Sequence, residues 1–190
     1  MLIYCHGFGS SGQATKAQIL RTNFPDGTVI SPDLPLEPSA AILTIEQKIQ
    51  AINGNSRLLL VGSSLGGFYA LHLHQKSGVP AILLNPTVDP IGDTDRREQL
   101  ENNFEADDLA AWCDEYTNQI RGLYHPAESV NPDYLSIFLN RDDEVLDYRK
   151  AERYFKTKNC RITIADQGGH RFDKFEELIP DIRAIYTSLP

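Results

Sequence analysis

Short, nearly continuous apolar runs alternate along this chain with longer segments in which apolar residues recur at helical spacing. Runs that are apolar at successive positions are typical of parallel strands buried on both faces. The predicted strands are residues 2–5, 28–31, 57–62, 81–84, 136–139 and 161–165. The predicted helices are residues 13–22, 38–53, 65–76, 147–156 and 172–188, the last kinked or broken near Leu178 because Pro180 lies inside it. The pattern predicts an α/β fold, a three-layer sandwich around a central, mainly parallel sheet of about six strands.

Size and charge indicate one domain over residues 1–190, with no nucleic-acid or membrane partner. The chain has 41% hydrophobic and 23% charged residues, and 18 basic against 26 acidic residues give a net charge of −8. Nucleic acid and anionic membranes favour basic surfaces, so this balance argues against both. No run approaches the roughly 18 apolar residues of a membrane span, and the start lacks a basic signal-peptide region. We therefore expect a cytoplasmic protein.

The three cysteines predict neither a disulfide framework nor a zinc site, because their number is odd and they form no C-x-x-C pair. No other His, Cys or carboxylate cluster has ligand spacing, so no metal or cofactor is predicted.

The segment Gly62-Ser63-Ser64-Leu65-Gly66 follows an apolar run and precedes a helical pattern. G-x-S-x-G in this setting is the nucleophile elbow of an α/β-hydrolase, a sharp turn that exposes a serine hydroxyl between small residues. Only Ser64 fits, since Ser63 would need small residues at Val61 and Leu65. The alternative is a glycine-rich turn that caps a helix. A phosphate-binding loop fits less well, because no G-K-[ST] follows.

A serine nucleophile needs a base, and the best candidate is His170, which follows the last predicted strand and two glycines. His72 and His74 fall on the helix after the elbow, and His125 falls in an irregular region. A structural loop histidine is the alternative for His170.

The orienting acid is expected after the penultimate strand, where residues 140–147 contain four carboxylates. Asp143 matches best, because an aspartate followed by one residue and then apolar Val145 is the usual arrangement. Asp142 is second, and we expect it to be a solvated turn residue. Asp147 is better explained as the N-cap of the next helix.

The oxyanion hole would take backbone N–H groups from Leu65, after the nucleophile, and from Phe8, in the loop after the first strand. That loop begins His6-Gly7-Phe8-Gly9. The alternative is that His6-Gly7 is only a strand-ending turn.

Several of these segments together resemble the YqiA-type small bacterial esterases of the α/β-hydrolase superfamily. The segments are residues 6–11, 62–70, 85–86, 143–149 and 169–172. The resemblance implies a minimal α/β-hydrolase without the two leading strands. It also implies hydrolysis of carboxylic esters, extending to acyl-CoA thioesters, by a Ser64, Asp143 and His170 triad. This chain has Asp142 where such proteins usually carry glycine.

Residues 86–134 contain no evident strand and are densely charged at 93–98 and 105–108, with a predicted helix over 107–121. They are either a small cap-like insertion over the site or a solvated surface excursion.

The sequence favours an esterase acting on a small-molecule acyl ester. It leaves open an acyl-CoA thioesterase and a protein-interaction module that retains a weak triad. The acyl chain length, the physiological substrate and the oligomeric state stay open.

Overall fold

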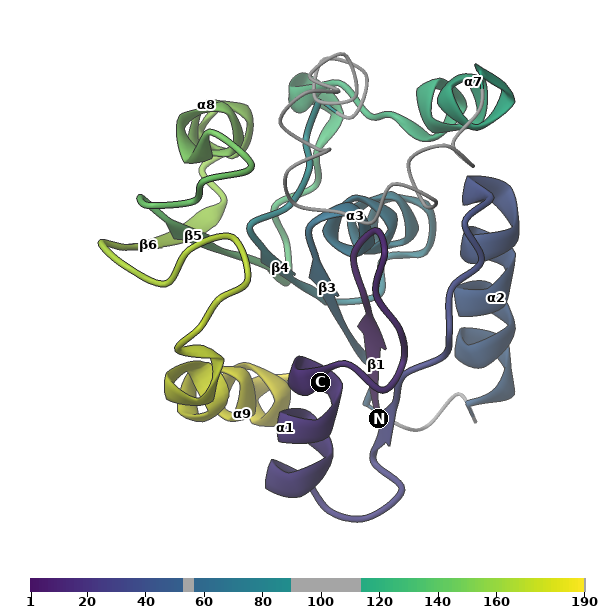
Figure 1. Cartoon of the computed structure of the whole chain (residues 1–190), viewed down its shortest axis with the longest axis vertical. Coiled ribbons are helices and arrows are strands. Elements are labelled where there is room, and N and C mark those ends of the chain that lie inside the picture. The colour runs from purple at the N-terminus through teal and green to yellow at the C-terminus, as the bar shows by residue number, and fades with distance from the viewer. Residues whose placement is uncertain (53–56, 90–113, 190) are drawn as a thin grey trace.

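The computed structural model describes residues 1–52, 57–89 and 114–189, which form a three-layer α/β fold around one sheet of six parallel strands (Figure 1). The strands are β1 (Leu2–Cys5), β2 (Val29–Ile30), β3 (Leu59–Ser63), β4 (Ala81–Leu84), β5 (Leu135–Asn140) and β6 (Arg161–Ala165). Their order across the sheet is β2-β1-β3-β4-β5-β6. All neighbouring pairs are parallel, so the carboxyl ends of all six strands lie along the same edge.

Helices cover both faces of the sheet. They are α1 (Thr15–Asn23), α2 (Pro38–Ala51), α3 (Leu65–Ser77), α7 (Asp114–Leu123), α8 (Tyr148–Lys156) and α9 (Ile179–Ser188). Side chains of α1 and α9 share one buried cluster, and side chains of α2, α3, α7 and α8 share the other (Figure 1). Successive β1 residues join opposite clusters, Leu2 one and Ile3 the other, because side chains alternate across a strand.

The predicted fold is confirmed, and the element boundaries differ only locally. Three predicted strands, 2–5, 81–84 and 161–165, have the observed bounds. The last predicted helix is a 3₁₀ turn, Phe175–Leu178, followed by α9. Pro180 lies in the first turn of α9, where a missing N–H costs no hydrogen bond, so the break falls where proline predicts it.

The predicted helix at 107–121 corresponds in its described part to α7, and its first residues lie outside the described part of the chain. Residues 90–113 of the predicted insertion also lie outside it. Within residues 1–52, 57–89 and 114–189, no helix is both long and apolar enough to cross a membrane.

Helix α3 begins against the carboxyl end of β1, and this approach leaves no room for side chains at two glycines. A Cβ on Gly66 would lie 2.1 Å from the Cys5 carbonyl oxygen, and one on Gly62 would lie 2.3 Å from the Gly66 oxygen. Both obstacles are backbone atoms, which cannot move aside as the end of a flexible side chain can. These contacts fix the start of α3 on the sheet.

We predict that Gly66→Ala lowers the free energy of unfolding by about 3 kcal/mol, since overpacking against backbone forces the helix away from β1. Urea unfolding followed by circular dichroism measures the change. Gly122→Ala in α7 is the control, because a Cβ there meets open space. It should raise stability by about 0.5 kcal/mol. Equal effects of the two changes would contradict the packing argument.

Candidate active site

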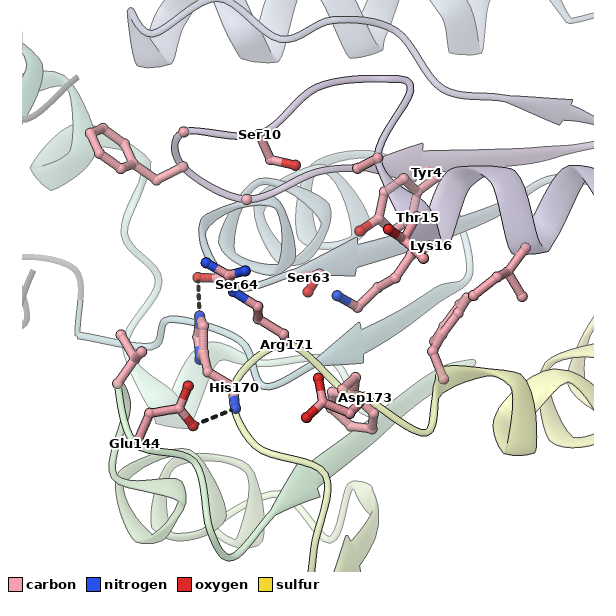
Figure 2. Close-up of a pocket in the computed structure, with 18 residues that line it drawn as sticks. Tyr4, Ser10, Thr15, Lys16, Ser63, Ser64, Glu144, His170, Arg171 and Asp173 are labelled. Carbon is pink, nitrogen blue, oxygen red and sulfur yellow. Dashed lines mark hydrogen bonds between the residues drawn. The ribbon is translucent and has the colours of Figure 1, made fainter. Parts of the chain in front are cut away.

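The predicted site residues lie at the carboxyl edge of the sheet, where ligands of open α/β sheets usually bind. Ser64 directly follows β3, Asp143 follows β5 and His170 follows β6. Segments that are distant in sequence therefore meet at one place (Figure 2).

Ser64 has the strained backbone that the elbow pattern predicts. Its φ of 56° and ψ of −123° lie in a region that residues with a side chain rarely adopt. The turn is held on both sides: the Ser64 N–H donates to the Leu84 carbonyl at 3.0 Å, and the Ser64 carbonyl accepts from Gly67 N–H at 2.9 Å. The hydroxyl consequently projects from the tip of the turn into a cavity.

A chain of hydrogen bonds joins Ser64, His170 and Asp143. Ser64 Oγ lies 3.0 Å from His170 Nε2, and His170 Nδ1 lies 2.9 Å and 3.0 Å from the two Asp143 carboxylate oxygens. The Nδ1 atom facing a carboxylate carries the proton, which leaves Nε2 free to accept from the hydroxyl. Only 1% of the Asp143 side chain and 9% of the His170 side chain are exposed.

Asp143 is itself fixed by the turn that contains it. Its Oδ1 accepts from the backbone N–H groups of Val145 at 2.9 Å and Leu146 at 2.8 Å. Val145 is buried, as expected of an apolar residue that anchors the loop. Of the carboxylates in this loop, Asp143 is therefore the one whose side chain reaches the imidazole.

The two neighbouring carboxylates hold the histidine loop by its backbone. Asp142 accepts from the N–H groups of Gly169 at 2.9 Å and Gly168 at 3.1 Å, and Glu144 accepts from His170 N–H at 2.9 Å. The hydrogen bond from Gly169 is the main cause that lowers the pKa of Asp142, with a further contribution from Gly168. Asp142 is exposed, as the sequence predicts for a turn residue, but it is also a partner of the histidine loop.

Asn85 and Asn140 also support the histidine loop, and neither role is predicted from the sequence. Asn85, 2% exposed, donates from Nδ2 to the carbonyls of Gly169 at 3.0 Å and His170 at 3.3 Å. Its Oδ1 accepts from Asn140 N–H at 2.9 Å, and Asn140 Nδ2 donates to Gly169 at 2.9 Å. A signal existed: each asparagine stands at the end of a buried apolar strand, where a polar side chain needs a partner.

The loop after β1 lies against Ser64. A Cβ on Gly7 would lie 3.1 Å from Ser64 Cβ. Buried His6 holds the loop, since its Nε2 accepts from Leu34 N–H at 2.9 Å and its Nδ1 donates to the Gly7 carbonyl at 2.9 Å. Burial lowers the pKa of His6, which favours this neutral form. The oxyanion role of the Phe8 and Leu65 amides stays a prediction.

Two cavities adjoin this loop. The larger, of about 790 Å³, contains Ser64 and His170 in its wall, together with residues of α1 and of the loop after β6 (Figure 2). The smaller, of about 310 Å³, includes Leu34, Leu65 and Tyr69 in its wall. Within the described part of the chain, no group of three or more His, Cys, Asp or Glu residues could hold a metal ion.

Comparison with solved structures shows that the fold is similar to that of several α/β hydrolases and esterases. Mouse α/β hydrolase domain-containing protein 10 is similar over 98% of this chain and 89% of its own, with 14% identity and a TM-score of 0.74. Esterase Pf2001 of Pyrococcus furiosus is similar over 99% and 82%, with 14% identity and a TM-score of 0.74. Est1E of Butyrivibrio proteoclasticus, solved with ferulic acid bound, is similar over 98% and 89%, with 16% identity and a TM-score of 0.69.

The chain belongs to the family described as "Uncharacterised protein family (UPF0227)", whose model matches residues 1–187. A UPF0227 protein of Serratia proteamaculans is 26% identical over 191 residues, and UPF0227 protein YcfP of Escherichia coli is 26% identical over 195 residues. Each alignment covers 98% of this chain and 99% of the relative. These matches confirm the family resemblance inferred from the sequence.

We predict that Asn85→Asp lowers the free energy of unfolding at neutral pH by about 2 kcal/mol. The aspartate keeps the acceptor for Asn140 N–H but replaces the donor with a charge that faces the carbonyls of Gly169 and His170. Urea unfolding measures the loss. Asn131→Asp, at an exposed position, should change stability by less than about 0.5 kcal/mol. If both variants were equally stable, Asn85 would not hold the histidine loop.

Proposed function

We propose that the protein is a serine hydrolase that cleaves carboxylic esters of small molecules through an acyl-enzyme intermediate. One observation carries this proposal: the hydrogen-bonded chain from Ser64 Oγ through the His170 imidazole to the buried Asp143 carboxylate, at the wall of an open cavity. The same three roles define serine hydrolases on unrelated folds.

In the proposed reaction Ser64 Oγ attacks the ester carbonyl carbon while His170 Nε2 takes the hydroxyl proton. The tetrahedral intermediate collapses, the bond to the alcohol oxygen breaks, and His170 returns the proton to that oxygen. Water then repeats the sequence on the acyl-serine and releases the acid and free Ser64. Asp143 holds the imidazole in the tautomer that accepts from Ser64 and stabilises the imidazolium that forms.

We assign the oxyanion to the backbone N–H groups of Leu65 and Phe8. Leu65 is the first residue of α3, and N–H groups in the first turn of a helix have no partner within the helix. The position of Gly7 against Ser64 brings the next residue, Phe8, to the same cavity. Each such donor contributes about 3 kcal/mol to stabilising the transition state of acyl transfer.

Two alternative functions, a thioesterase and a protein-interaction module, are supported to different degrees by the structure of the site. A thioesterase would use the same triad, and two cationic side chains in the larger cavity favour an anionic substrate of that kind. An interaction module would not need the strained Ser64 backbone or the hydrogen bonds that aim His170, so this geometry favours an enzyme. Pf2001 is an esterase and Est1E binds ferulic acid, and the similarity of fold to both agrees with ester hydrolysis.

We predict that a fluorophosphonate probe labels Ser64 and that Ser64→Ala abolishes both labelling and esterase activity. Peptide mapping by mass spectrometry identifies the modified serine. Ser63→Ala is the matched control, because Ser63 ends β3 and forms no hydrogen bond with His170 among the described residues. This variant should still be labelled at Ser64. An adduct on another residue, or none, would refute the proposed function.

We predict that Asp143→Asn lowers kcat/KM for an aryl ester by about 10⁴, because an amide favours the wrong imidazole tautomer. Asp142→Asn should cost less than about tenfold, since an amide oxygen keeps one hydrogen bond to the glycine pair. Circular dichroism checks that both variants fold. The reverse ranking would move the acid role to Asp142.

A further inference from the structure

The larger cavity contains two cations that the proposed mechanism does not use. Lys16 extends from the first turn of α1, and Arg171 is the residue after His170. Figure 2 shows both side chains in the cavity that contains Ser64, approaching it from different elements. The hydroxyl-bearing residues Ser10 and Thr15 contribute to the same wall.

Neither cation has a bonded partner within the part of the chain that the structure describes. Lys16 and Arg171 form no ion pair or hydrogen bond there, and the charges of Arg171 and Asp173 act on Lys16 through space. Glu144, the other carboxylate of the cavity, accepts from His170 N–H. The two positive charges are therefore available to a ligand.

The arrangement is electrostatically unfavourable when the cavity is empty. Burial, together with the nearby charge of Arg171, lowers the pKa of Lys16 to about 8, and Asp173 opposes this only in part. Lys16 is half-buried and Arg171 is exposed, so water screens their repulsion only in part. An anion between them would relieve this repulsion and form charge-assisted hydrogen bonds with both.

A solvated charge on the rim of a cleft would be the simpler explanation, and the position of Lys16 argues against it. Its side chain is half-buried rather than extended into water, in a chain whose net charge is −8. A protein with this net negative charge does not attract anions over long range, so an anionic ligand requires a local pair of cations.

We propose that Lys16 and Arg171 form a subsite for an anionic group, a carboxylate or a phosphate, carried by the ester that reacts at Ser64. The inference rests on the proposed function and specifies its substrate class. A cavity of about 790 Å³ has room for both an ester group and a charged group. The planar guanidinium can bind two oxygens of the anion, while the ammonium acts as a compact charge.

The test compares kcat/KM for two pairs of esters, each pair an anionic ester and a neutral analogue. The first pair is the 4-nitrophenyl monoester of adipic acid and 4-nitrophenyl heptanoate. The second is the butanoyl ester of glycerol 3-phosphate and the butanoyl ester of glycerol. The first places a carboxylate on the acyl side, and the second places a phosphate on the alcohol side. In at least one pair the anionic ester should have a kcat/KM higher than that of the neutral ester by about tenfold or more.

The variants show whether the two cations cause that preference. In Lys16→Met/Arg171→Met the ratio of anionic to neutral kcat/KM should fall at least about tenfold. Lys16→Arg keeps the charge and should retain most of the ratio, and Asp173→Asn should raise it. Lys48→Met/Arg153→Met is the matched control, because it removes the same charge at exposed positions outside the cavity. Its ratio should equal that of the unmodified protein.

A ratio near one in both pairs, or a ratio that the double variant leaves unchanged, overturns the anionic subsite. If neutral esters are hydrolysed in a Ser64-dependent way in that case, the proposed function stands and only the subsite fails. If no ester is hydrolysed and the fluorophosphonate does not label Ser64, both proposals fail together.

Discussion

The close approach of helix α3 to the ends of β1 and β3 is the constraint on which the site depends. Gly66 lies against the Cys5 carbonyl, and Gly62 lies against the Gly66 carbonyl, so the chain must turn from strand to helix within one residue. That residue is Ser64, and its positive φ follows from the sharpness of the turn. The strain is held by the surrounding hydrogen bonds, and it aims the hydroxyl away from the sheet.

The histidine is held differently, by hydrogen bonds to the backbone of its loop as well as to its imidazole. Polar side chains from the residue after β4, from the end of β5 and from the loop after β5 bind the N–H and carbonyl groups of residues 168–170. A loop with two glycines has high conformational freedom, and these hydrogen bonds remove it on folding. The rigid sheet thereby sets the distance between the imidazole and Ser64, which is the quantity on which proton transfer depends.

The charges near the site fall into two groups with different tasks. The carboxylates of residues 142–144 face the histidine loop and fix its orientation, whereas Lys16 and Arg171 face the open cavity. Glu144 and Asp173 lie in the wall of the same cavity as the two cations, and Glu144 accepts from His170 N–H. An acidic chain thus places two cations beside Ser64, balanced in number by these two carboxylates.

The sequence by itself determined the layers, the parallel sheet and the elbow, because apolar runs and glycine spacing act over a few neighbouring residues. It also identified Ser64, Asp143 and His170 as candidates, because each follows a predicted strand in the order expected for nucleophile, acid and base. The tertiary structure decided which of several adjacent carboxylates contacts the His170 imidazole and what Asp142 and Asn85 bind. It also decided that Lys16 and Arg171 share a cavity. These facts depend on side-chain direction and on segments up to 155 residues apart, from Lys16 to Arg171 (171 − 16). No local pattern encodes such distances, since they arise only when the strands assemble.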